Sequence, residues 1–263
     1  MSSNNPFEDH GVEYLSPSSI SKFLKDPAKW LVNIAGYKDR AFSPAMSYGT
    51  CLEHGITHGL QNDATVNDCM KVAYESYDAI YDDVEKNKAD YDFEGCEKKK
   101  ELLHDTIDSM LDLFRAYGTP TAVQNRVELE IDDLPVPIIG YTDLEYETQV
   151  RDIKTTALPP KLKQDYNRQL SFYAKATDKK PFIDCIQSTK TKKELTVFEI
   201  QNTDQHFGDL KRIAFKMMRL LSLSSDIREV CYLSCLEPDI SNEDWSKQWG
   251  ANEIVGAKEL FFI

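Results

Sequence analysis

The spacing of hydrophobic positions changes near residue 119, and this change predicts two structural regions. From Leu15 to Tyr117 apolar residues recur every three or four positions, as in helices that bury one face. From Val123 to Thr156 apolar and polar residues alternate, as in strands with one buried side. We therefore expect a group of helices followed by a β-meander.

Sequence signals for helix starts divide the first region. A capping side chain followed by a proline that fits the first helical turn occurs at Ser16-Pro17, Asp26-Pro27 and Ser43-Pro44. The helix that begins at the third point is expected to continue to about Leu60. Residues 63–117 carry two further apolar stripes on a charged background, and Gly95 is expected to divide them.

The second region reads as strands interrupted by helices. Strands are expected near 127–132, 136–147, 149–155, 182–189 and 195–200, and helices near 162–176 and 204–223. This order predicts an α/β fold, with a mixed sheet core flanked by helices and an N-terminal helical cap.

The length of 263 residues suits a single domain. Its expected parts are a flexible N-terminus, a helical region, a catalytic α/β core and a C-terminal extension, at 1–13, 14–118, 119–225 and 226–263.

Charge and cysteine content narrow the functional class. The formal net charge of −13 argues against a protein that coats nucleic acid electrostatically, although clustered acids suit bound metal ions. We expect no signal peptide, because no basic region is followed by an apolar run near residue 1, and no membrane span, because no apolar run approaches roughly 20 residues. None of its six cysteines forms a C-x-x-C pair. We expect a cytoplasmic protein with reduced thiols and no membrane contact.

A candidate reaction site lies between Gly140 and Thr155. Asp152 and Lys154 share one face of a strand because side chains alternate. A two-residue turn at Glu147-Thr148 would place Asp143 directly across from Asp152, with their Cβ atoms roughly 5 Å apart.

This grouping has a chemical use. Two close carboxylates repel unless a divalent cation neutralises them, and Mg²⁺ takes one or two carboxylates plus water and phosphate oxygens. A neighbouring lysine can stabilise a phosphorane or position water, so the set suits phosphodiester hydrolysis. A solvated hairpin face with an Asp–Lys pair is the alternative, and for an isolated D-x-K tripeptide it is the better explanation.

The surrounding motif resembles the PD-(D/E)xK nuclease superfamily. Gly140-x-x-Asp143 followed by Asp152-x-Lys154-Thr155 matches its pattern, with Thr142 in place of the usual proline. The resemblance is closest to bacterial recombination nucleases, CRISPR-associated exonucleases and phage exonucleases of the lambda type. It implies a restriction-endonuclease-like core and two Mg²⁺ or Mn²⁺ ions, with the main-chain carbonyl of Ile153 as a further ligand.

A second matching segment follows the catalytic strand. Gln169 and Tyr173 resemble the family's Q-x-x-x-Y motif and share a helix face. The resemblance implies that both contact the nucleic-acid strand or orient Lys154; a core position for Tyr173 is the alternative. Lys161 and Arg168 are candidates for a basic DNA path beside this helix, or are solvated charges.

The N-terminal segment also resembles this branch. Leu15–Phe23 matches its first helix, and the helix near Gly49-Thr50 follows it. Relatives place a metal-binding histidine or glutamate four residues past that glycine, a position held here by Glu53. His54 would point about 100° away.

Two further pairs of candidate residues each have two interpretations. His54 and His58 form an i, i+4 pair that could suggest zinc, but no third ligand is evident and a helical surface pair is favoured. Glu128 and Glu130 share a strand face and either add an acid to the site or are solvated.

The resemblance implies an exonuclease that hydrolyses DNA from its ends. The expected activity is 5′→3′ degradation of double-stranded DNA in recombination or DNA processing. The resemblance also suggests a phage origin, in which case the protein would act in the host cytoplasm. A homo-oligomer, as in ring-forming relatives, and a single-strand annealing or recombination partner are expected. No iron–sulfur cluster is expected, because Cys231 and Cys235 have the wrong spacing. A structure-specific or nicking endonuclease and a non-catalytic binding protein remain alternatives.

Overall fold

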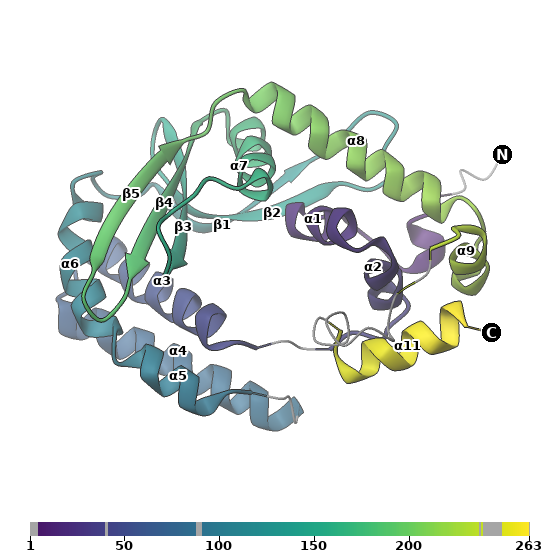
Figure 1. Cartoon of the computed structure of the whole chain (residues 1–263). Coiled ribbons are helices and arrows are strands. Elements are labelled where there is room, and N and C mark those ends of the chain that lie inside the picture. Colours follow the sequence, from purple (N-terminus) through teal and green to yellow (C-terminus); the bar gives the residue numbers. More distant parts are fainter. Residues whose placement is uncertain (1–4, 40–41, 88–90, 237, 239–248, 263) are drawn as a thin grey trace. The chain divides into compact units, whose positions relative to one another are not determined.

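The computed structural model describes residues 5–39, 42–87, 91–236, 238 and 249–262 (Figure 1). Its helices are η1 (Glu8–His10), α1 (Pro17–Lys25), α2 (Pro27–Ile34), α3 (Pro44–Asn62), α4 (Val66–Asn87), α5 (Phe93–Lys100), α6 (Leu103–Arg115), α7 (Gln164–Thr177), α8 (Thr203–Leu221), α9 (Ile227–Leu233) and α11 (Ala251–Phe261). Its strands are β1 (Ala122–Leu129), β2 (Ile138–Glu145), β3 (Gln149–Thr156), β4 (Lys180–Ser188) and β5 (Lys193–Glu199).

The five strands form one mixed sheet in the order β1-β2-β3-β4-β5. Strand β3 pairs antiparallel with β2 and parallel with β4, and β4 pairs antiparallel with β5. Helix α7 is the crossover that a parallel β3–β4 pair requires. This architecture confirms the predicted α/β fold with a mixed sheet core, flanking helices and additional helices near the N-terminus.

The contacts of the chain divide it into two compact units. The first consists of Met1–Asp39, Arg126–Gly140 and Asn202–Ile263, and the second of Arg40–Asn125 and Tyr141–Gln201. Two of the boundaries fall inside β1 and β2, so both units share continuous strands. The single domain over residues 1–263 stays a prediction.

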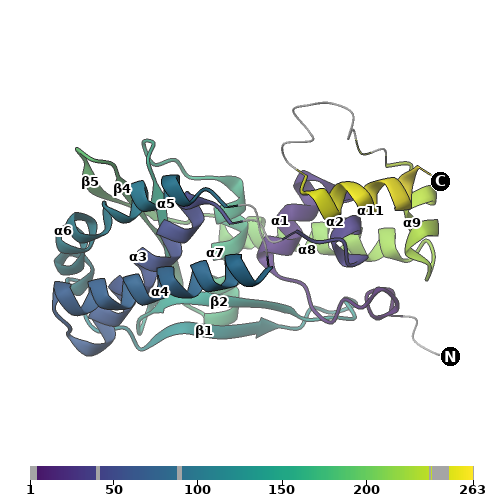
Figure 2. The ribbon, with the colours of Figure 1, turned by 90° about the horizontal axis from the view of Figure 1, so that it is seen from below.

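Helices α3 to α6 gather on one face of the sheet in the second unit, and α7 covers the other (Figures 1 and 2). The core between α3 and the sheet includes Ile56, Ile107 and Ile153, all buried. Gly55 allows close helix packing, because a Cβ there would lie 2.9 Å from Ile107 Cδ1. A buried hydrogen bond between hydroxyl groups also connects α3 to β4: Tyr48 Oη lies 2.7 Å from Ser188 Oγ.

The predicted helix starts are confirmed. Ser16 and Ser43 each accept a hydrogen bond from a backbone N–H of the first turn, and Asp26 does the same for α2. Each cap is followed by proline at the first helical position, where the missing N–H costs nothing. The sequence therefore predicted the N-termini of α1, α2 and α3 correctly.

Other expectations need correction. Residues 5–13, expected to be loose, contain η1 and the fully buried Phe7. Gly95 lies inside α5, where its N–H donates to Asp92 at 2.8 Å, instead of dividing two helices. Strand β1 ends at Leu129, so Ile131 lies beyond the strand to which it was assigned. Helices α9 and α11 were not predicted, and Trp245 lies outside the described residues.

The six cysteines carry no disulfide, and all except Cys235 are buried. Cys231 is therefore a packing residue, as expected. Among the described residues, no helix combines the length and apolar character needed to cross a membrane.

Glu253 fastens α11 to α2 within the first unit. Its carboxylate lies 2.7 Å from Lys29 Nζ and accepts hydrogen bonds from Asn33 Nδ2 at 2.8 Å and from the Gly250 N–H at 2.9 Å. Burial alone would raise the pKa of Glu253, but these donors outweigh it and hold the pKa below its usual value. A lowered carboxyl pKa stabilises the fold above the unfolded-state pKa, and this stabilisation is lost as pH falls through the folded-state pKa.

We expect Glu253→Gln to lower the free energy of unfolding by about 1–3 kcal/mol at pH 7. The difference from wild type should shrink below about pH 4.5, where the carboxylate gains a proton in the unfolded chain. Urea unfolding at pH 7 and at pH 3.5 measures both quantities, with the exposed Glu85→Gln as control. A pH-independent difference would contradict the role of the charge.

Candidate active site

The β2–β3 hairpin brings the two predicted acids together in the second unit. Its observed register, with Leu144 opposite Arg151 and Glu145 opposite Val150, is the register predicted from a turn at Glu147-Thr148. The same register places Asp143 opposite Asp152. At this point the Ile153 N–H donates to Oδ2 of the Asp143 side chain at 2.7 Å. The paired residues of β2 and β3 end at Leu144 and Arg151, one position before the two acids.

Asp152 and Lys154 form the centre of the site. Lys154 Nζ lies 2.5 Å from Asp152 Oδ2, and the Asp152 side chain is only 1% exposed. Among the described residues, Lys154 is the only cation paired with Asp152, and no other hydrogen bond to its two buried carboxylate oxygens is present. A buried carboxylate with so few partners is costly, so its environment suits a divalent cation.

The electrostatics of the site show an excess of negative charge. Burial and the neighbouring charges of Asp152 and Glu53 raise the pKa of Asp143 well above its usual range, against Lys154 and the Ile153 N–H. Burial also raises the pKa of Asp152, although Lys154 opposes it. Burial lowers the pKa of Lys154, but Asp152 and Asp143 outweigh this and raise it. One ammonium thus faces three carboxyl groups.

Glu53 is the third of these carboxyl groups and projects from α3. Burial, followed by the charge of Asp152, raises the pKa of Glu53 to about 7, with Lys154 acting in the opposite direction. Its carboxylate accepts a hydrogen bond from Gln124 Nε2. His54, one residue later, instead lies 2.8 Å from Ser76 Oγ on α4. This difference agrees with the expected helical register.

The site needs further ligands to hold a metal ion. Across the part of the chain that the structure describes, no three His, Cys, Asp or Glu side chains are grouped closely enough to do so. Asp143 and Asp152 could contribute two carboxylates, and Ile153 a main-chain carbonyl. Water and substrate oxygens would complete the coordination, as is common for Mg²⁺.

Helix α7 borders the site on the face of the sheet that carries Lys154. The Lys154 Nζ lies 5.9 Å from the centre of the Tyr166 ring. One turn further, Gln169 Nε2 donates to Tyr173 Oη at 3.0 Å, and burial followed by Asp152 raises the pKa of Tyr173. The Gln169–Tyr173 pair is therefore adjacent to the acids, although Tyr173 is itself buried.

The two predicted basic contacts differ in accessibility. Lys161 is exposed in the loop before α7. Arg168 is only 8% exposed and forms an ion pair with Asp165 one turn earlier. Charge alone could not distinguish these two environments, because Arg168 occurs on the buried side of an amphipathic helix.

The remaining candidates have other partners. Glu128 pairs with Arg126 at 2.6 Å, and Glu130 is exposed; both belong to the first unit. His58 accepts from Asn62 Nδ2 at 3.2 Å, so the two histidines of α3 do not share a partner.

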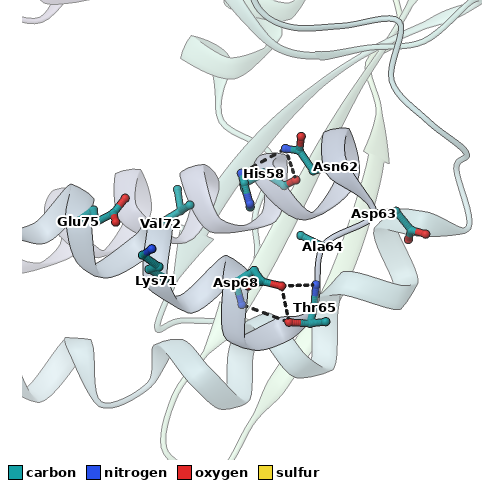
Figure 3. Close-up of a pocket in the computed structure, with 9 residues that line it drawn as sticks. All are labelled: His58, Asn62, Asp63, Ala64, Thr65, Asp68, Lys71, Val72 and Glu75. Carbon is teal, nitrogen blue, oxygen red and sulfur yellow. Dashed lines mark hydrogen bonds between the residues drawn. The ribbon is translucent and has the colours of Figure 1, made fainter.

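A pocket of about 470 Å³ lies between α3 and α4, and none of the candidate acids lines it (Figure 3). Its lining includes His58, Asn62, Thr65 and Asp68. The Asp68 N–H donates to Thr65 Oγ1 at 3.3 Å and the Thr65 N–H donates to Asp68 Oδ2 at 3.2 Å, so these two residues cap the start of α4. His58 and Asn62 form a second hydrogen-bonded pair in this pocket.

A buried ion pair between β3 and β4 was not predicted from the sequence. Arg151 donates to both carboxylate oxygens of Asp184 on β4, each at 2.7 Å, and its guanidinium carbon lies 3.8 Å from the centre of the Tyr117 ring. Glu145 is a further buried acid, but it is satisfied by Thr142, Asn125 and Lys179. Asp184 and Glu145 each lie between hydrophobic or aromatic strand neighbours, which is a weak sequence signal of burial, whereas Arg151 is followed directly by Asp152.

The fold and the acid–acid–lysine arrangement together define a candidate metal-dependent hydrolase site on a mixed sheet. The profile of the PD-(D/E)XK nuclease superfamily matches residues 14–234. Since this match covers most of its length, the chain belongs to the PD-(D/E)XK nuclease superfamily. Members of this superfamily generally use divalent metals such as Mg²⁺. The prediction of the superfamily is confirmed, and that of the phage and recombination branch stays a prediction.

Solved structures support the fold. The chain is similar to a candidate exonuclease from Eubacterium rectale, with a TM-score of 0.56 and 15% identity over 95% of this chain and 94% of that one. The protein SSO0001 matches 64% of this chain and 84% of its own at 15% identity, with a TM-score of 0.33, which is too low to support an argument. No curated protein matches the chain in sequence.

Proposed function

We propose that this protein is a metal-dependent exonuclease that hydrolyses phosphodiester bonds at the ends of double-stranded DNA. The observation that carries the proposal is the buried Asp152 carboxylate, which lies 2.5 Å from Lys154 Nζ and has no other hydrogen bond among the described residues. Because the chain belongs to a nuclease superfamily, we assign this pair to the hydrolysis of phosphodiester bonds. The similarity to a candidate exonuclease supports attack from an end.

The proposed roles follow from the chemistry of each group. Asp143, Asp152 and the Ile153 carbonyl hold one or two Mg²⁺ or Mn²⁺ ions, with Glu53 as a further carboxylate. When bound, such an ion polarises the phosphate and lowers the pKa of water. Lys154 stabilises the charge that develops on the phosphate oxygens and is held in place by Asp152.

The same proposal extends to substrate and assembly. Gln169, Tyr173, Lys161 and Arg168 contact the DNA strand or position Lys154. The resemblance to lambda-type exonucleases supports 5′→3′ polarity, a role in recombination or DNA processing and a ring-shaped homo-oligomer. It also supports a single-strand annealing or recombination partner. We further propose a cytoplasmic location and, from the spacing of Cys231 and Cys235, no iron–sulfur cluster.

Degradation of end-labelled linear duplex DNA tests this proposal. With Mg²⁺ or Mn²⁺, wild type should release a 5′ label first, leave closed circular DNA intact and stop when EDTA is added. Lys154→Ala should be inactive under the same conditions. Lys98→Ala, which removes an exposed lysine paired with Glu94, should keep full activity.

The alternatives give different results in the same assay. Nicking of closed circles would assign the site to an endonuclease, since only an endonuclease can begin on DNA without ends. Release of the 3′ label first would reverse the polarity. No hydrolysis of DNA by folded wild type, together with no binding of Mg²⁺ or Mn²⁺, would favour a non-catalytic binding protein.

A further inference from the structure

Leu158 is an exposed apolar residue in the loop that follows β3, the strand that carries Asp152 and Lys154. It is 73% exposed and belongs to the loop 157–163, which joins β3 to α7. Single exposed leucines are common on protein surfaces and by themselves need no explanation. Leu158 differs because the surrounding backbone holds it in a fixed exposed position.

Three features restrain this loop. The Thr156 hydroxyl accepts from the Leu158 N–H at 3.0 Å and donates to the Leu158 carbonyl at 3.1 Å. The buried Gln187 donates to the Ala157 carbonyl at 3.4 Å. Pro159 and Pro160 then fix the next two φ angles. The apolar side chain therefore projects from a restrained arch, and little conformational entropy is lost when it binds.

The arch begins and ends at the reaction site. Leu158 is four residues after Lys154, a separation of at most about 14 Å in an extended chain. At the other end, the Tyr166 ring lies 5.9 Å from Lys154 Nζ and 5.3 Å from Lys163 Nζ. A duplex rises about 3.4 Å per base pair, so Leu158 is within about four steps of a phosphate at Lys154.

The charge of the loop suits a polyanion. Residues 157–163 contain Lys161 and Lys163 and no acidic residue, in a chain whose formal net charge is −13. Leu162, which lies between the two lysines, is 41% exposed. Apolar side chains flanked by cations fit a nucleic-acid strand, which offers phosphates to the lysines and base faces to the leucines.

We propose that Leu158 packs against an unstacked base within about four nucleotides of the scissile phosphate and so helps to open the end of a duplex. Lys161 and Lys163 hold the adjoining phosphates while the leucine occupies the space left by the partner base. This inference rests on the proposed nuclease function and adds a substrate-contacting residue to it. Because a single strand needs no opening, the contribution of Leu158 should depend on the substrate.

Single-turnover hydrolysis of a blunt duplex and of the same labelled strand alone tests the inference. For Leu158→Ala we expect the duplex rate to fall about 5- to 50-fold and the single-strand rate to change less than twofold. Leu158→Met should retain the wild-type ratio because it keeps an apolar side chain of similar size. Leu113→Ala, which removes a leucine on α6 that is 46% exposed, is the control.

The outcomes separate this inference from the proposed function. Active wild type with an unchanged Leu158→Ala ratio, or with equal losses on both substrates, would overturn the role of Leu158 and leave the nuclease intact. A change of oligomeric mass in Leu158→Ala, measured by light scattering, would assign the arch to a protein contact. Wild type that hydrolyses neither substrate would overturn both proposals.

Discussion

Replacing Asp152 with asparagine is expected to lower the rate of DNA hydrolysis by about a thousandfold or more. The substitution keeps the shape of the side chain and removes the charge that would bind a divalent cation and that positions Lys154. It also relieves repulsion, because Asp152 raises the pKa values of both Asp143 and Glu53. The folded protein without metal should therefore be at least as stable as wild type.

Thermal unfolding with and without Mg²⁺ separates loss of function from loss of fold. A ligand that binds only the folded state stabilises it by about 2.7 kcal/mol at one hundred times its Kd. Wild type should show a Mg²⁺-dependent rise in Tm, and Asp152→Asn should show little or none. Glu94→Gln, an exposed carboxylate paired with Lys98, should behave like wild type. Asp152→Asn with near-wild-type activity would remove Asp152 from the site.

The part of the site predicted most accurately depends on local geometry. A two-residue hairpin turn fixes the register of both strands, so locating it at Glu147-Thr148 was enough to place Asp143 opposite Asp152. The helical rotation of about 100° per residue similarly separated Glu53 from His54. Both arguments use spacing within one element or one hairpin, which a sequence states directly.

The features that were missed depend on contacts between distant segments. Asp184 follows Arg151 by thirty-three positions in the sequence. The parallel pairing of β3 with β4 places Asp184 opposite Ile153, within reach of the Arg151 side chain. No local pattern reveals such a partner, so a charged residue on a strand is read as solvated. Arg168 shows the same limit, since its environment depends on which face of α7 is buried. Charge identity is local information, whereas burial is decided by the tertiary fold.

The Arg151–Asp184 pair stabilises the strand that carries Asp152. Arg151 is 3% exposed and Asp184 is fully buried, and Tyr117 Oη donates to Asp184 Oδ1 at 3.2 Å. Arg151 also donates to Gln149 Oε1 at 2.7 Å. Its guanidinium therefore binds both Asp184 on β4 and the side chain at the start of its own strand. Removing one member of a buried pair leaves the other charge without compensation, which is far costlier than breaking a surface pair.

We expect Arg151→Met to lower the free energy of unfolding by about 3–5 kcal/mol. The double variant Arg151→Met/Asp184→Leu should lose less, because it leaves no buried charge behind. Lys98→Met, which breaks the exposed pair with Glu94, should cost about 0–1 kcal/mol. Urea unfolding of the four proteins at pH 7 measures these differences. A double variant less stable than Arg151→Met would show that each charge contributes beyond their pairing, whereas a partial recovery would identify the uncompensated Asp184 carboxylate as the cause of the loss.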